Sequence, residues 1–217
     1  MAADQGDVRP RRRATKPEER GRVAERTRER ILAAAVAEFG AKGYSGARTA
    51  SIAERAGVNQ QLISYHFGGK QGLLDELRGR WATSGTATVP PDATFEESFA
   101  THLDAVLDQP DWARLVIWQA LGDDPGNQDK LDQEQRERLR QGVERIRQRQ
   151  RDGELADDVD PEFALLLSYM LAFAPLALPK HVAGIFGVDP LSQEYRERCR
   201  DQLAHLLRPD RRRHNDH

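Results

Sequence analysis

The sequence predicts an all-α protein with a small N-terminal helical unit and a larger C-terminal one. Through most of the chain, apolar residues recur at intervals of three and four, the spacing of one face of an α-helix. Strand signals are weak throughout, because apolar and polar residues rarely alternate and no hairpin dipeptides separate apolar segments. Cys199 is the single cysteine, so neither an internal disulfide nor a cysteine metal cluster is possible, and stability depends on the core that 217 residues can bury.

Charge is unevenly distributed along the chain. Residues 1–80 hold 16 Lys/Arg and 10 Asp/Glu residues, a net charge of +6, whereas the remainder has a net charge of −8. This asymmetry indicates that only the N-terminal part meets a polyanion. The alternative is that the charged faces are merely solvated.

Composition also bears on the compartment. Charged residues make up 31% of the chain and hydrophobic ones 38%, which is typical of a cytosolic helical protein. The first 26 residues lack the apolar core of a signal peptide. The longest apolar run, 163–178, is shorter than the roughly 20 residues of a membrane span, and we interpret it as a buried helix. We therefore expect a cytoplasmic location and no membrane partner.

The first predicted elements are a basic arm and a helix. Residues 1–22 contain seven Lys/Arg residues and two prolines without an apolar face, which predicts a disordered arm. Helical spacing begins after Thr27, a plausible N-cap, and Gly43 is a plausible end.

Two short helices joined by a tight turn follow. The first covers about 50–55, where Ser51 and Glu54 have the spacing of a capping box. Gly57 suits the positive φ of a turn, and Asn59 is expected to cap a second helix over about 60–67. Gly68-Gly69 ends that helix, and another begins near residue 70.

The C-terminal part is predicted to hold longer helices. The small and proline-containing segment 83–91 indicates a boundary. We therefore expect an arm at 1–22, domains at 23–82 and 92–208, and a flexible tail at 209–217. The helices predicted beyond the boundary cover about 95–107, 111–121, 127–151, 161–174 and 191–207. The helix at 161–174 is apolar on nearly all sides, which indicates burial on both sides.

The two short helices carry the strongest functional signal. Two helices joined by a glycine-containing turn of three or four residues form a helix-turn-helix. Its outward polar side chains suit DNA, because Gln and Asn pair with adenine edges while hydroxyl and ammonium groups bind phosphates. The DNA-contact candidates are Arg48, Thr49, Asn59, Gln60, Gln61, Ser64, Tyr65, His66 and Lys70.

Residues 27–77 resemble the DNA-binding region of TetR/AcrR-family transcriptional regulators. The matching features are Phe39-Gly40-Ala41-Lys42-Gly43-Tyr44, Thr49, Ile52-Ala53, Ala56-Gly57-Val58, Tyr65-His66-Phe67-Gly68-Gly69-Lys70 and Leu73-Leu74. The resemblance implies a three-helix DNA-binding domain whose third helix enters the major groove. One position departs from it: Ser64 stands where many members carry a tyrosine, which leaves Tyr65, His66 and Lys70 more of the phosphate contacts.

The resemblance also implies a C-terminal domain that forms a homodimer and binds a small-molecule effector. The dimer is expected to form through about 161–174 and 191–207, and to place two reading helices about 34 Å apart on a pseudo-palindromic double-stranded operator. Candidates for lining the effector cavity are Phe99, Leu103, Trp112, Trp118, Gln119, Val143, Ile146, Phe163, Tyr169 and Met170. The alternative for each is a place in the plain core.

The function predicted is a DNA-binding repressor that an effector releases from its operator. A nonspecific, architectural DNA binder driven by the arginine arm is the first alternative; the arm itself would be a phosphate grip, a minor-groove arm or a solvated leader. An enzyme is the second alternative, but the sequence has no phosphate loop, nucleophile elbow or HExxH motif. We therefore expect no catalytic residue, no metal and no cofactor.

Overall fold

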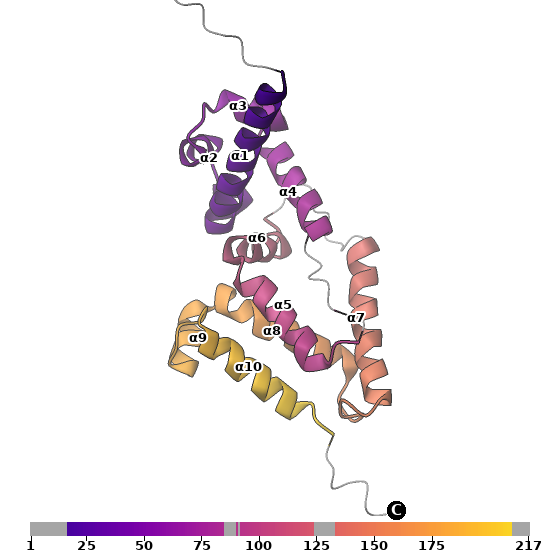
Figure 1. Cartoon of the computed structure of the whole chain (residues 1–217). Helices are drawn as coiled ribbons and strands as arrows, with labels where there is room; N and C mark the ends of the chain where they lie inside the picture. Colours follow the sequence, from indigo (N-terminus) through magenta and orange to yellow (C-terminus); the bar gives the residue numbers. More distant parts are fainter. Residues whose placement is uncertain (1–16, 85–89, 91, 124–132, 210–217) are drawn as a thin grey trace, which may run out of the picture.

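Ten α-helices make up the protein in the residues that the structure, a computed structural model, describes: 17–84, 90, 92–123 and 133–209. The described residues contain no strand. Helices α1 to α4 lie at one end of the molecule, α5 and α8 to α10 at the other, and α6 lies between the two groups (Figure 1). The all-helical prediction is confirmed.

The N-terminal group packs around one small core. It consists of α1 (Pro17–Gly46), α2 (Thr49–Ala56), α3 (Gln61–Phe67) and α4 (Lys70–Ser84). Each helix contributes at least one apolar side chain that is at most 1% exposed, and these are Ile31, Ala35, Phe39, Ile52, Ile63, Leu73, Leu74 and Leu77. Burial of this shared face holds α2 and α3, each of eight residues or fewer, because helices of that length are not stable alone.

The first helix begins earlier than the sequence predicts. It starts at Pro17, inside the expected arm, and Thr27 is an interior residue whose Oγ1 donates to Val23 O at 2.9 Å. Proline is favoured in a first helical turn, which explains the earlier start. The rest of the arm, 1–16, lies outside the described residues. Gly43 does interrupt the helix, with φ 68° and ψ 178°.

The turn between α2 and α3 has the expected geometry. Gly57 adopts φ 61°, and its N–H donates to carbonyls of the last turn of α2. Asn59 Oδ1 accepts from Gln61 N at 2.8 Å, but the N-cap of α3 is Gln60 rather than the expected Asn59. The expected capping box is wrong: Arg48 occupies the N-cap of α2, and no side chain caps that end.

The C-terminal group has a second and larger core. Its helices are α5 (Phe95–Leu107), α6 (Pro110–Ala120), α7 (Gln133–Arg151), α8 (Pro161–Ala177), α9 (Pro179–Phe186) and α10 (Gln193–Leu206). Thr94 and Glu97 form a capping box at the start of α5, and Asp160 caps α8 through Phe163 N at 2.7 Å. The expected start of α7 at residue 127 falls outside the described residues.

Helix α8 continues through Pro175, which sequence analysis took as its end. Proline lacks an N–H and leaves the carbonyl four residues earlier without its helical donor. That carbonyl, Leu171 O, accepts a hydrogen bond from the buried Tyr195 hydroxyl of α10 at 2.8 Å. The next helix, α9, was not predicted; it begins at Pro179, where proline sits in a first turn.

Helix α6 joins the two groups. Leu115 belongs to the N-terminal core and Trp112 packs against it, although both follow the predicted domain boundary. Trp118 Nε1 donates to Gly40 O at 3.2 Å, and the Asp123 carboxylate accepts from Ser45 N at 3.1 Å. We call this contact of α6 and Asp123 with α1 the α1–α6 joint.

No single helix in the described ranges combines the length and apolar composition needed to cross a membrane, although α8 and α9, bent by 105° at their junction, pass that test as a pair.

Candidate nucleic-acid interface

The short helix α3 separates a buried face from an exposed polar one. Ile63 is 1% exposed and anchors α3 in the N-terminal core, while Leu62 and Phe67 pack against that core from its edge. Tyr65 is 81% exposed, and Gln61 and Ser64 are exposed beside it. An 81% exposed tyrosine gains little from burial, so its position suits a contact with another molecule.

The two adjacent glutamines are in different situations. Gln60 Nε2 donates to Thr49 Oγ1 at 2.9 Å, which ties the start of α3 to the start of α2. Gln61 is exposed, and within the described part of the chain its side-chain amide makes no hydrogen bond. Gln61 is therefore the glutamine whose amide is available to a base edge.

The remaining predicted residues lie before α3, near its end, or at the start of α4. Arg48 is exposed at the N-cap of α2, and Asn59 is exposed in the turn. His66 is partly buried and its ring packs edge-on against Tyr65, with centroids 5.0 Å apart. The nine candidates thus belong to the start of α2, the turn, α3 and the start of α4.

Lys70 is held by an aromatic ring. Its Nζ lies 4.4 Å from the centroid of Tyr44, so the ring face attracts the ammonium group at the start of α4. The backbone N–H groups of this first turn point in the direction that favours an anion. Tyr44 was matched by family resemblance without a role, and this contact assigns it one: it positions Lys70.

Sequence reasoning missed two arginines of α1 that hold the helix-turn-helix. Arg28 Nη1 donates to His66 O at 3.3 Å, and its guanidinium lies 4.6 Å from the centroid of Phe67. Arg30 donates to Ala56 O and to Gly57 O, the latter at 3.2 Å. The last carbonyls of a helix carry partial negative charge, so these arginines stabilise the ends of α3 and α2. In the sequence they differ in no way from the other arginines of α1.

Acidic residues complete the charge network between α1 and α4. Arg28 pairs with Glu76 at 2.7 Å, and Arg80 pairs with Glu76 at 3.2 Å and with Glu29 at 2.7 Å. Arg28, and then Arg80, lower the pKa of Glu76 against the opposing effect of burial. Both carboxylates are therefore ionised at neutral pH, and the network holds α4 against the helix that positions α3.

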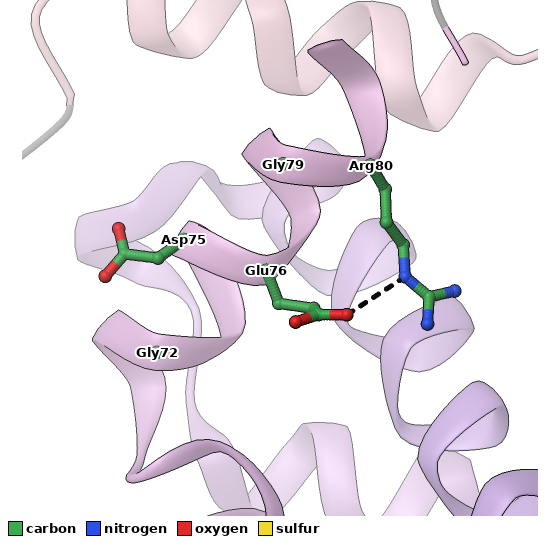
Figure 2. A pocket seen from close by; sticks show the side chains of 5 residues that line it. All are labelled: Gly72, Asp75, Glu76, Gly79 and Arg80. Atoms are coloured by element: carbon green, nitrogen blue, oxygen red, sulfur yellow. Dashed lines mark hydrogen bonds and ion pairs between the residues drawn. The ribbon is translucent and has the colours of Figure 1, made fainter. Parts of the chain in front are cut away.

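A surface hollow on α4 does not form a binding centre. Its lining side chains diverge: Glu76 and Arg80 point to one side, linked by their ion pair, whereas Asp75 points to the other (Figure 2). Asp75 is engaged by Arg78 at 3.0 Å. The glycines Gly72 and Gly79 open this hollow, but no set of polar groups converges in it.

A buried carboxylate lies beneath the start of α2. Glu38 is 1% exposed and accepts from Lys42 Nζ at 2.7 Å. Lys42, helped by the Arg48 backbone N–H, lowers the pKa of Glu38 although burial opposes the charge. The side chain of Arg48, at the N-cap of α2, stays exposed.

The predicted cavity residues lie in several different places. Phe99, Leu103 and Ile146 are at most 3% exposed in the C-terminal core. Gln119, Val143 and Tyr169 are partly buried. The other four lie elsewhere: Trp112 and Trp118 are at the α1–α6 joint, and Phe163 and Met170 are 58% and 53% exposed on α8. Helical periodicity indicates which face of a helix is apolar, but not which other helix that face packs against.

Family models cover most of the chain. Residues 31–77 match the model of "Bacterial regulatory proteins, tetR family", and residues 98–208 match the model "Tetracyclin repressor-like, C-terminal domain". The second match alone spans more than half of the chain.

Individual relatives match over shorter stretches. The transcriptional repressor SCO4008 of Streptomyces coelicolor is 35% identical over 104 residues, covering 46% of this chain and 53% of the relative. The repressor NicS of Pseudomonas putida is 43% identical over 110 residues, covering 47% and 52%. The chain thus spans about half the length of the curated relatives it matches.

Solved structures share the fold over nearly their full length. The regulator SCO4942 of Streptomyces coelicolor superposes with a TM-score of 0.62 at 24% identity, covering 83% of this chain and 98% of the other. A tetR-family protein from Rhodococcus gives a TM-score of 0.58 at 21% identity, covering 84% and 97%. With two family models in chain order and this shared fold, the chain belongs to the TetR family of bacterial regulatory proteins.

Proposed function

We propose that the protein is a sequence-specific DNA-binding transcriptional repressor of the cytoplasm. One observation supports this most strongly: α3 exposes Gln61, Ser64 and Tyr65 while its own position is fixed from beneath by Ile63 and from its end by Arg28. A reading helix requires such a rigid support, because its amide must reach a base edge within hydrogen-bond distance. The family consists of regulatory proteins rather than enzymes.

The operator contacts divide by chemistry. Gln61 would read a base edge, and Tyr65, Ser64, Arg48 and Lys70 would contact phosphates. Gln60 and Thr49 would act as a pair, because their side chains already bond each other. Asn59 and His66 would support the two ends of α3 and approach the backbone.

The working form is a homodimer through α8 and α10. Phe163, Leu166 and Met170 lie at i, i+3 and i+7 of α8, one face of the helix, and are 53% to 58% exposed. Leu206 of α10 is 65% exposed. Exposed apolar side chains in helical register indicate an interface with a partner. A two-fold dimer would place two reading helices about 34 Å apart and favour a pseudo-palindromic operator.

An effector would act through the α1–α6 joint. A small molecule in the C-terminal group releases the operator only if it binds more tightly to a dimer with wrongly spaced reading helices. Helix α6 contributes to the N-terminal core and leads from α5, so a shift of α6 would carry α1 with it. The arm would add affinity without preference.

Fluorescence anisotropy tests the function. Operators are first selected from random-sequence duplexes, and the dissociation constants for the selected and a scrambled duplex are compared at about 0.15 M salt. A preference of about 10³ or more supports the proposal. Equal affinity for both duplexes, with a steep salt dependence, would replace it with the architectural alternative.

A further inference from the structure

A buried nitrogen in the C-terminal group has no partner. His102 Nε2 of α5 is covered from solvent and makes no hydrogen bond within the described residues. Native proteins rarely leave a buried polar atom unpaired, because it loses its hydrogen bonds to water without replacement. Burial also lowers the pKa of His102, so the imidazole is neutral at pH 7 and offers one nitrogen as donor and the other as acceptor.

Two aromatic rings of α8 surround this imidazole. Tyr169 packs edge-on against His102 with centroids 5.0 Å apart, and Phe173 does so at 6.3 Å. Tyr169 and Phe173 are one helical turn apart, and their rings are nearly parallel, at 2° and 6.3 Å. Such a wall favours a flat apolar group, because aromatic rings pack well edge-on and offset-stacked.

Arginines of helix α7 add positive charge near His102 and Tyr169. Residues 138, 142, 145 and 149 lie on one face of α7. That face meets α8, since a Cβ on Gly142 would lie 3.1 Å from Leu165 Cδ2, and it meets α5, since Arg149 donates to Ser98 Oγ at 2.5 Å. Burial raises the pKa of the Tyr169 hydroxyl, and the positive charges of Arg138 and Arg145 partly oppose this rise.

The charge on this face is only partly compensated. Arg149 pairs with Glu154 at 3.5 Å, whereas Arg145 has no ion pair or hydrogen bond in the part of the chain that the structure describes. Arg145 also lowers the pKa of Arg149, after the larger effect of burial, which shows that the two cations repel each other. An anion near Arg145 would relieve this repulsion.

We propose that α5, α7 and α8 bind an aromatic carboxylate with a second polar group: the ring packs on Tyr169 and Phe173, the carboxylate pairs with Arg145, and the polar group bonds His102 Nε2. The inference rests on the proposed function only where it identifies this ligand as the effector that releases the protein from DNA. It narrows the effector class to small planar anions.

Isothermal titration with three related probes tests the site on the full chain without DNA. The probes are 6-hydroxy-2-naphthoate, 2-naphthoate, which lacks the hydroxyl, and 6-hydroxy-2-naphthamide, which lacks the charge. We expect 6-hydroxy-2-naphthoate to bind about tenfold more tightly than 2-naphthoate, which leaves the buried His102 Nε2 unpaired, and about threefold more tightly than the amide, which loses an ion pair with the exposed Arg145.

Two variants connect each preference to one residue. Arg145→Gln is expected to remove the preference for the carboxylate and to keep the preference for the hydroxyl. His102→Phe keeps an aromatic ring and is expected to do the reverse. Arg136→Gln, an exposed arginine on another face of α7, is the matched control and keeps both preferences.

The outcomes are separable from those of the proposed function. A dissociation constant for 6-hydroxy-2-naphthoate above about 1 mM, or equal affinity in the wild type and Arg145→Gln, overturns the site. Operator binding is measured separately on the same preparations without probe. If operator binding fails and the probe preferences hold, the ligand site stands and the DNA-binding function falls.

Discussion

At the scale of single residues, two neighbouring glutamines of the helix-turn-helix are expected to have different roles. The amide of Gln60 is held by Thr49, so using it on DNA would first break a bond of about 1 kcal/mol. The amide of Gln61 has no such competitor among the described residues. Sequence alone treats the two residues alike, since both are polar and outward on the same short helix.

Replacing each glutamine by alanine should separate these roles. Gln61→Ala is expected to relax preference at one operator base pair by about 1–3 kcal/mol, because one base-edge contact is lost. Gln60→Ala is expected to weaken all sequences alike, because α3 loses its bond to α2. Binding to a set of single-base operator variants measures both effects. A uniform loss for Gln61→Ala would contradict its assignment as the reader.

Lys70 is expected to act through charge alone. Lys70→Gln should weaken binding to every duplex similarly and reduce the slope of log K against log salt by about 1, because one phosphate contact is lost. Lys180→Gln, which removes an exposed lysine of α9 in the C-terminal group, is the control for overall charge. An unchanged salt slope in Lys70→Gln would show that its ammonium binds only Tyr44.

His102 should make stability depend on pH. The pKa of His102 is lowered in the folded protein. Above the ordinary value of about 6.5, the imidazole is therefore neutral in both the folded and the unfolded protein, and its titration costs no stability. As pH falls below about 6.5, the unfolded chain takes up a proton first and the folded state loses stability, by at most about 1.4 kcal/mol per pH unit.

Urea unfolding at pH 7.5, 6.5 and 5.5 checks this expectation. The free energy of unfolding of the wild type should fall relative to that of His102→Gln as the pH decreases. This range lies above that of Glu38 and Glu76, whose lowered pKa values give stability that is lost only below about 4.5. A constant difference between the two proteins would mean that His102 titrates normally.

At the scale of helices, sequence signals within a few residues predicted turns well, but they failed where a residue distant in the sequence determines the structure. The glycine turn follows from residues within a few positions, and the structure has it; Asn59 Oδ1 accepts from Gln61 N, although Gln60 rather than Asn59 is the N-cap. Pro175 is tolerated because Tyr195, twenty residues later, satisfies Leu171 O, and no local pattern contains that contact. The supports of α3 are similar: Arg28 reaches His66 across 38 residues. The proposed DNA-contact residues could be chosen from the sequence because they lie in or beside one short helix, whereas the residues that position that helix could not.

The α1–α6 joint predicts a large effect from one methyl group. A Cβ on Gly40 would lie 2.5 Å from Asp111 O, and a backbone atom cannot move aside as a side chain does. Gly40→Ala should therefore displace α6 and destabilise the protein by about 1–3 kcal/mol.

Gly21→Ala is the matched control for that substitution. Gly21 lies in the same helix with nothing within 4 Å of an added Cβ, so alanine there should stabilise by about 0.5–1 kcal/mol through helix propensity alone. Urea unfolding measures both changes. If Gly40→Ala were as stable as Gly21→Ala, α6 would not be held closely against α1, and the proposed route from effector to operator would lose its basis.

At the scale of the whole molecule, the two cores are joined by α6 and the apolar face of α8 is left uncovered. The tryptophans of α6 show why the sequence could not divide the chain cleanly. Their apolar spacing predicts burial, but only the structure shows that the partly buried Trp112 packs against the N-terminal core rather than against its own group. Under the proposed function, the exposed face of α3, the α1–α6 joint and the uncovered face of α8 would act together only in a dimer.

Introducing a charge into the face of α8 tests that dependence. Leu166 is 56% exposed, so Leu166→Glu should fold normally in the monomer but place a carboxylate, desolvated and without a partner, in the dimer interface. We expect a monomer in sedimentation velocity, and an operator affinity reduced by about a hundredfold or more because the two half-sites are no longer bound together. Leu121→Glu, at a 75% exposed leucine after α6, should remain a dimer with normal affinity. A Leu166→Glu protein that stays dimeric would place the interface elsewhere. A monomer that binds the operator as tightly as the wild type would mean that one copy of α3 is enough for full affinity. We do not expect this, because the exposed face of α3 is short and offers few contacts to DNA.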